Sequence, residues 1–189
     1  MELLFIKLAK HQIIETERLV LRPVTLDDAE AMFEYASDKE NTRYTFPTNQ
    51  SLEETKNNIA QFYLANPLGR WGIELKSSGE FIGTIDLHKM DTVLKKGAIG
   101  YIIHKKYWNQ GLTTEANRAV IELAFEKIGM NKLTALHDKD NPASGKVMEK
   151  SGMRFSHEEP YARMDQHEKG LIVTRVHYIL TKEDYFANK

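Results

Sequence analysis

The stretch AIGYIIHKKYWNQGLTTEANRA, residues 98–119, decides the fold, because it changes from a strand pattern to a helix pattern across a short polar turn. The first N–H groups of a helix have no partner within the helix and attract anions. Gly111 lets a ligand approach the backbone closely, and Thr113 and Thr114 are expected to cap the helix and to donate hydroxyls to phosphate oxygens. The junction therefore predicts a diphosphate site, although a glycine between a strand and a helix is also common without one.

A second element lies downstream, in NPASGKVMEKSGM at residues 141–153. Together with YWxxGxxTEA at residues 107–116 and ETERLVLRPVTLDDAEAMFEY at residues 15–35, it resembles the GNAT acetyltransferases, in particular the ribosomal-protein N-terminal acetyltransferase branch. The resemblance implies an α+β GNAT fold, with a mixed central sheet and helices on both faces. It also implies a single GNAT domain at residues 13–189 after an N-terminal extension at residues 1–12.

The hydrophobic patterns along the chain agree with this fold. Strands are predicted at residues 18–23, 70–75, 81–88, from about 97, at 132–137 and at 172–180, and helices at 27–37, 52–65, from 115 to Gly129 and after 141. Thr25 and Ser51 are expected to cap the first two helices. The apolar run at residues 3–6 is too short for a signal peptide or a membrane span.

The resemblance implies where the coenzyme acetyl-CoA binds. In the family, the turn after the fourth strand binds the pyrophosphate through a Q/R-x-x-G-x-G/A pattern, which falls here on residues 108–113 and matches strictly only at the central glycine. The fourth and fifth strands splay apart, and the pantetheine arm pairs with their free backbone groups. The coenzyme-binding residues implied in this region are Ile102, Ile103, His104, Asn109, Gln110, Gly111, Leu112, Thr113 and Thr114. The side chains of the two isoleucines are equally suited to the core.

The downstream element is expected to complete the site. The resemblance implies that Asn141 bonds the coenzyme arm, although a helix cap before Pro142 explains it equally well. Ser144 is a candidate acid that donates a proton to the departing thiolate, or else a solvated helix serine. Lys146 and Lys150 are candidates for the 3'-phosphate, or ordinary surface lysines.

The acceptor side is less well defined. The resemblance implies a glutamate two residues before Gly100, but Ala98 stands there, which favours an amine of low pKa or another base. The candidate bases are Glu74, Asp86 and His88, each of which could equally be an ordinary strand residue. The expected lining of the acceptor pocket comprises Tyr44, Phe46, Trp71 and Trp108, with Arg43 offering a charge for an acidic group and core packing as the alternative for Trp71.

Composition sets the remaining expectations. The 26 Lys and Arg residues nearly balance 27 Asp and Glu residues, which argues against direct nucleic-acid binding, and the absence of cysteine excludes an acyl-cysteine intermediate. We expect a cytoplasmic monomer or homodimer, without a metal or membrane attachment, that transfers acetyl directly to a primary amine. The acceptor is a protein N-terminus, with a small amine (amino sugar, polyamine or amino acid) as the alternative. A non-catalytic CoA-binding module is the alternative from another functional class.

Overall fold

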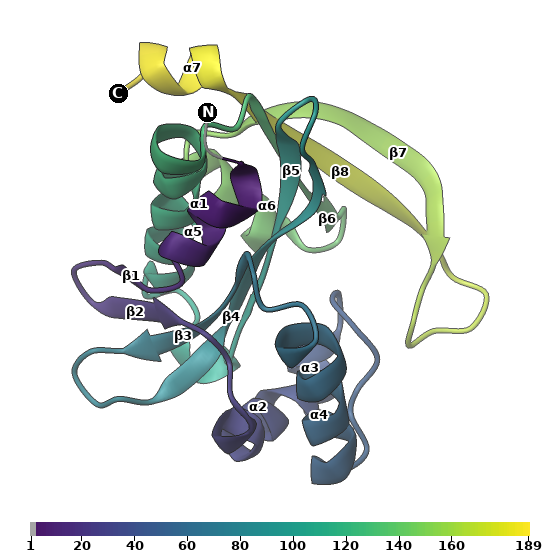
Figure 1. Cartoon of the computed structure of the whole chain (residues 1–189). Coiled ribbons are helices and arrows are strands. Elements are labelled where there is room, and N and C mark those ends of the chain that lie inside the picture. Colours follow the sequence, from purple (N-terminus) through teal and green to yellow (C-terminus); the bar gives the residue numbers. More distant parts are fainter. Residues whose placement is uncertain (1–2) are drawn as a thin grey trace.

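The computed structural model describes residues 3–189, and these form one mixed sheet of eight strands in the order β1-β2-β3-β4-β5-β6-β8-β7 (Figure 1). All neighbouring strands are antiparallel except β5 and β6, which run parallel and are joined through helix α5. The strands are β1 (Ile14–Glu15), β2 (Leu19–Arg22), β3 (Arg70–Leu75), β4 (Phe81–Asp91), β5 (Lys96–Ile103), β6 (Lys132–Asp138), β7 (Arg154–Met164) and β8 (Ile172–Thr181).

The helices lie in two groups, and each group has its own buried cluster. Figure 1 shows α1 beside α5, while α2, α3 and α4 form a separate group. The α5 residues Ala116 and Val120 pack with strand residues in the main core, whereas Met32 and Tyr35 of α2 pack with Phe81 in a second cluster. The helices are α1 (Leu4–Lys10), α2 (Ala29–Ala36), α3 (Lys39–Thr42), α4 (Leu52–Asn58), α5 (Leu112–Glu122), α6 (Pro142–Lys150) and α7 (Lys182–Ala187).

Among residues 3–189, four shorter helical turns lie beside these helices and strands. A 3₁₀ turn, η1 (Leu26–Asp28), precedes α2, and another, η3 (Lys105–Tyr107), follows β5. π-helical turns η2 (Ile59–Leu64) and η4 (Leu123–Ile128) continue α4 and α5. The fold and the main elements therefore confirm the sequence-based prediction, including the mixed sheet.

The predicted helix boundaries agree with local hydrogen bonding. Thr25 and Asp28 form a capping box, and the hydroxyl of Ser51 accepts a bond from the N–H of Glu54 at 3.1 Å. Gly129 ends η4 with a φ of 84°, a left-handed conformation that suits glycine. Three short helices, α1, α3 and α7, were not predicted, because four to seven residues are too few to establish a helical period.

The feature of the sheet that creates the site is the short pairing between β5 and β6. Only residues 96–98 of β5 pair with residues 132–134 of β6. The remainder of β5 stays paired with β4, and the remainder of β6 stays paired with β8. The two parallel strands therefore diverge after Ala98, and their facing backbone groups are available to a ligand.

Candidate active site

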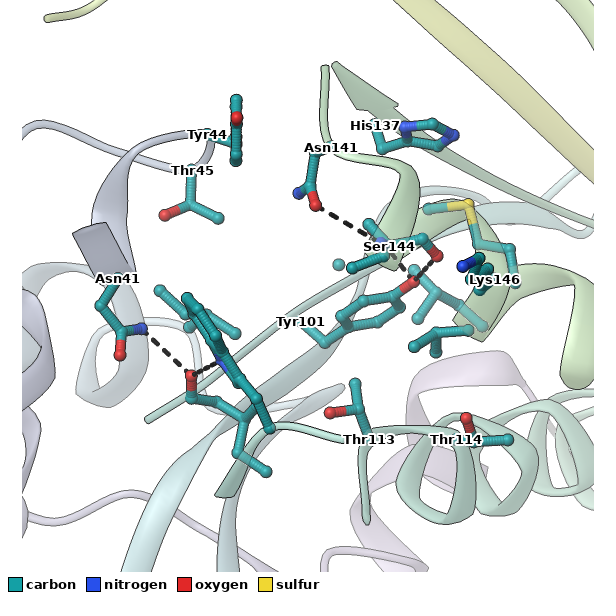
Figure 2. A pocket seen from close by; sticks show the side chains of 18 of the residues that line it. Asn41, Tyr44, Thr45, Tyr101, Thr113, Thr114, His137, Asn141, Ser144 and Lys146 are labelled. Atoms are coloured by element: carbon teal, nitrogen blue, oxygen red, sulfur yellow. Dashed lines mark hydrogen bonds between the residues drawn. The ribbon is translucent and has the colours of Figure 1, made fainter. Parts of the chain in front are cut away.

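A cleft of about 900 Å³ opens where β5 and β6 diverge (Figure 2). Residues 99–103 of β5 and residues 136–138 of β6 form its walls. The turn before α5 and the first turn of α6 line it on one side, and residues 44–46 after α3 line it on the other. The cleft thus extends from the N-terminus of α5 to the segment that follows α3.

The turn before α5 has the geometry of an anion site. Gly111 is the N-cap of α5, with a φ of 77°, and it has no side chain that could accept a bond from the N–H groups of this helix end. The N–H groups of the first turn therefore lack partners within the helix and are available to an anion. The prediction that Thr113 and Thr114 cap the helix is wrong, because Gly111 occupies the cap and places both threonines inside the first turn. Both line the cleft, together with Leu112 and Asn109.

Two of the predicted coenzyme-binding residues, Gln110 and His104, are not among the cleft-lining residues. The side-chain amide of Gln110 donates to the carbonyl of Lys106 at 3.2 Å. The N–H of His104 donates to the carbonyl of Ile82 at 2.7 Å, and its ring Nδ1 accepts from the N–H of Lys106 at 3.0 Å. β5 ends at Ile103, one residue before His104, and the backbone N–H of His104 is therefore bonded within the protein. Whether His104 or Gln110 contacts the coenzyme stays a prediction.

Ile102 and Ile103 do line the cleft, as predicted. The carbonyl of Ile103 accepts bonds from the side-chain nitrogens of Asn41 and Trp108, both at 3.0 Å. Asn41 also accepts from the N–H of Lys105 at 2.6 Å. The end of β5 is therefore fixed by an α3 residue that the sequence analysis missed.

The first turn of α6 brings together the downstream candidates and one further residue. Asn141 caps α6 through a bond of 3.4 Å from the N–H of Ser144, while Figure 2 shows its amide nitrogen turned toward the cavity. The Ser144 hydroxyl donates to the hydroxyl of Tyr101 at 3.2 Å, and Tyr101 donates to the carbonyl of Ser144 at 2.9 Å. Burial raises the pKa of Tyr101, a bond from Ser144 partly offsets this effect, and the phenol stays protonated at neutral pH. Tyr101 was missed because an isolated strand tyrosine reads as core.

Among the three candidate bases, only Asp86 lines the cleft. His88 bonds to it, with Nδ1 at 3.1 Å from the Asp86 carboxylate. Gly100 on the neighbouring strand makes room for this pair, since a Cβ there would lie 2.8 Å from the carboxylate oxygen. Glu74 instead accepts a bond from Arg22 at 2.6 Å and lies outside the cleft lining.

The predicted aromatic lining is correct for three residues of four. Tyr44, Phe46 and Trp108 line the cleft. Trp71 is 1% exposed and belongs to the main core, so the packing alternative is the correct one. A large aromatic in a strand is usually buried on the core side, and the sequence gives no register that would tell the two faces apart.

Arg43 forms ion pairs within the protein. Its guanidinium bonds Asp165 at 3.1 Å and Glu168 at 2.7 Å, both in residues 165–171, which we call the β7–β8 loop. The ring of His167 lies 3.4 Å from the carbonyl of Thr42. The prediction that Arg43 offers its charge to an acidic acceptor group is therefore wrong, because two carboxylates of the loop already neutralise it.

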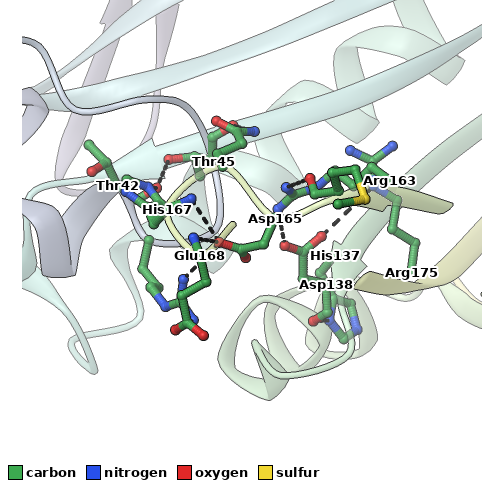
Figure 3. Close-up of polar contacts among 12 residues, drawn as sticks. Thr42, Thr45, His137, Asp138, Arg163, Asp165, His167, Glu168 and Arg175 are labelled. Atoms are coloured by element: carbon green, nitrogen blue, oxygen red, sulfur yellow. Dashed lines mark hydrogen bonds and ion pairs between the residues drawn. The ribbon is translucent and has the colours of Figure 1, made fainter. Parts of the chain in front are cut away.

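The strand residues next to this loop are attached to the cleft wall. Asp138, at the end of β6, is 4% exposed and pairs with Arg163 of β7. Arg175 of β8 lies 3.8 Å from the other carboxylate oxygen (Figure 3). The loop end of the β7–β8 hairpin therefore contacts both sides of the cleft: Arg163 and Arg175 meet Asp138 of β6, and the loop residues Asp165 and Glu168 meet Arg43.

The residues present fit acetyl-CoA. The Gly111 turn offers unpaired backbone donors to a diphosphate, and the diverging strands offer backbone groups to the amides of a pantetheine arm. Lys146 and Lys150 line the cleft from α6 and add positive charge beside the turn. Whether either lysine contacts the 3'-phosphate stays a prediction.

Comparison with known proteins agrees with this geometry. The model of the acetyltransferase (GNAT) domain matches residues 18–154. The uncharacterised N-acetyltransferase YoaA of Bacillus subtilis (strain 168) is 36% identical over 146 residues, covering 75% of this chain and 82% of YoaA. A crystal structure of a GNAT-family acetyltransferase from Bacillus anthracis superposes with a TM-score of 0.80 at 27% identity, covering 90% of this chain and 99% of that one.

A third relative has a more specific name. The Bacillus subtilis (strain 168) protein named "Putative ribosomal N-acetyltransferase YdaF" is 34% identical over 120 residues, covering 62% of this chain and 64% of that protein.

This chain belongs to the GNAT acetyltransferase family. It is an N-acetyltransferase that uses acetyl-CoA and an amine acceptor, rather than a non-catalytic CoA-binding module. Within residues 3–189, no helix combines the length and the apolar character needed to cross a membrane.

Proposed function

We propose that this enzyme acetylates the N-terminal α-amine of a protein, with acetyl-CoA held along the cleft between β5 and β6. The observation that carries the proposal is the divergence of these strands after Ala98. It opens a cleft that extends from the Gly111 turn to Ser144. Acetyl-CoA supplies an activated thioester, and the protein holds it with its diphosphate at the helix N-terminus and its sulfur beside Asn141 and Ser144.

The remaining roles follow from the contacts in the cleft. The acceptor nitrogen attacks the thioester carbonyl, the C–N bond forms, and the C–S bond breaks with release of the thiolate. Ser144 donates a proton to that sulfur, and the proton lost by the amine passes to Asp86 or to water. A thiol with a pKa near 8.5 is a tolerable leaving group, so we expect the help from Ser144 to be moderate.

The pKa of the acceptor decides how much base catalysis the reaction needs. An α-amine with a pKa of about 7.8 is roughly 14% neutral at pH 7, whereas a lysine amine with a pKa of about 10.4 is neutral in roughly one molecule in 2,500. Because Ala98 stands where similar proteins have a glutamate, an α-amine is the acceptor that requires least of this site. The name of the relative YdaF supports the same acceptor class.

One observation favours a second candidate, a small-molecule amine. The β7–β8 loop bonds across to the segment after α3, with Gln166 donating to the carbonyl of Thr45 at 3.4 Å and Arg43 bound to Asp165. A closed loop at this position restricts the space for a polypeptide acceptor. The choice of acceptor therefore depends on whether this loop leaves room for the residues that follow the N-terminal residue of a polypeptide acceptor.

A direct comparison of acceptors tests the proposal. We expect thiol release from acetyl-CoA to be fastest with peptides that have a free α-amine and to disappear when that amine is blocked, even if an internal lysine remains. Faster turnover of polyamines, amino sugars or amino acids would support the small-molecule acceptor instead. The variant Asp86→Asn should lower kcat with the peptide, and Glu74→Gln, outside the cleft, is the matched control.

A further inference from the structure

The segment before β2 docks on the first turn of α5 through one carboxylate. Glu115 accepts three hydrogen bonds: from the hydroxyl of Thr16 at 2.6 Å, from the N–H of Arg18 at 2.8 Å and from Nε of Arg18 at 2.7 Å. These contacts join residues nearly one hundred positions apart in the sequence. Neither Arg18 nor Glu115 lines the main cleft.

The same guanidinium also holds the turn that precedes the helix. One terminal nitrogen of Arg18 donates to the carbonyl of Gln110 at 3.0 Å, and the other lies 3.5 Å from the position that a Cβ on Gly111 would occupy. A trans peptide is planar, and its C=O and N–H point in opposite directions. Fixing the carbonyl of Gln110 toward Arg18 therefore fixes the N–H of Gly111 away from it.

We propose that Arg18 and Glu115 form a positioning pair that orients the N–H of Gly111 toward the diphosphate of the coenzyme. Glu115 holds the guanidinium, and the guanidinium holds the peptide between Gln110 and Gly111. The pair acts through the backbone and not through net charge, because the carboxylate neutralises the arginine. This role rests on the coenzyme placement proposed above.

The alternative explanation is charge masking alone, in which Arg18 merely cancels the repulsion between Glu115 and a diphosphate. The two explanations differ for Glu115→Gln. Charge masking predicts that Glu115→Gln binds the coenzyme as well as or better than the wild type and restores binding to Arg18→Gln. A positioning pair predicts that both single variants weaken binding and that the double variant is about as weak as either one, since the two residues act as a unit.

The test is an NMR titration of the full chain with two ligands, CoA and pantetheine, which lacks the diphosphate. We expect Arg18→Gln and Glu115→Gln each to weaken CoA binding about tenfold and to leave pantetheine binding within about twofold. In the wild type, the Gly111 amide resonance should shift with CoA and not with pantetheine. Arg154→Gln, which removes an exposed ion pair with Asp184, is the matched control and should change neither affinity.

The outcomes separate the two proposals. Loss of affinity for both ligands to the same extent would indicate general disruption and would overturn the positioning role, as would unchanged CoA affinity or rescue in the double variant. A wild-type protein that binds no CoA would overturn the proposed coenzyme placement itself. Thermal unfolding of each variant without ligand shows whether the fold is retained.

Discussion

The hydroxyls of Tyr101 and Ser144 form a reciprocal contact across the cleft: Ser144 donates to Tyr101 at 3.2 Å, and Tyr101 donates to the carbonyl of Ser144 at 2.9 Å. One residue lies on β5 and the other in the first turn of α6. The contact holds the helix at a fixed distance from the strand just where β5 and β6 have diverged. Because the Ser144 hydroxyl donates to Tyr101, this hydrogen bond must break before Ser144 can donate its proton to a departing thiolate.

We predict that Ser144→Ala lowers kcat about tenfold and changes the KM for acetyl-CoA by less than about twofold. General acids contribute about 10²–10⁴-fold in typical enzymes, and a thiolate needs less help than most leaving groups. Steady-state kinetics at saturating acceptor check this. Ser144→Thr, which keeps the hydroxyl, is the control, and an unchanged kcat in Ser144→Ala would remove Ser144 from the mechanism.

Asn141 has two separable roles, and two substitutions distinguish them. Asn141→Ala removes both the cap of α6 and the amide donor, so we expect a loss of stability of about 1 kcal/mol and a raised KM for acetyl-CoA. Asn141→Ser keeps a good cap but lacks the amide nitrogen. It should retain the stability and still show the raised KM, as measured by urea unfolding and kinetics. If Asn141→Ser behaves as the wild type in both assays, Asn141 is a cap only.

The contact between Arg43 and the β7–β8 loop should affect the acceptor and not the coenzyme. We predict that Arg43→Ala changes the KM for the acceptor severalfold and leaves the KM for acetyl-CoA unchanged. The loss of stability should not exceed about 1 kcal/mol, because Glu168 is exposed and the buried side chain of Asp165 keeps the bonds from two backbone N–H groups. Lys56→Ala, which removes an exposed pair on α4, is the control. Equal changes in both KM values would contradict a role confined to the loop.

The pH dependence of the Arg18–Glu115 contact has a defined sign. Burial is the largest single effect on Glu115 and would raise its pKa, but the bonds from Thr16 and Arg18 together outweigh it and hold the pKa below its ordinary value. A carboxylate whose pKa is lowered in the folded state stabilises the protein at pH values above its ordinary pKa of about 4.3. This stabilisation is lost as the pH falls through the lowered pKa. The difference in unfolding free energy between the wild type and Glu115→Gln should therefore be constant from pH 6 to 8 and shrink below about pH 4. A difference that changes between pH 6 and 8 would contradict this assignment.

Local patterns predicted the fold, whereas the coenzyme-binding residues came from the family resemblance and stay a prediction. The period of two in strands, the period near 3.6 in helices, and the signals at Ser51 and Gly129 depend on neighbours in sequence, and they proved reliable. The family resemblance placed Asn141 and Ser144, and the structure places both beside the divergence of β5 and β6.

The missed features depend on contacts between distant residues. Arg43 meets Asp165, and Arg18 meets Glu115, across about one hundred positions or more, and a pattern of neighbouring residues carries no such information. For Trp71 the sequence left both the pocket and the core open, because the side chains of a strand alternate between faces and register is set by pairing; the structure buries it in the core. The N–H of His104 also bonds to a residue on another strand, Ile82 of β4, whereas its ring bonds to the N–H of Lys106, two residues away.

The most direct test of the central claim is a crystal structure of the protein grown with saturating acetyl-CoA. The account predicts diphosphate oxygens within hydrogen-bonding distance of the backbone N–H groups of residues 111–114, with the thioester sulfur beside Asn141 and Ser144. A diphosphate bound elsewhere, or a cleft between β5 and β6 that stays free of coenzyme at saturation, would contradict it.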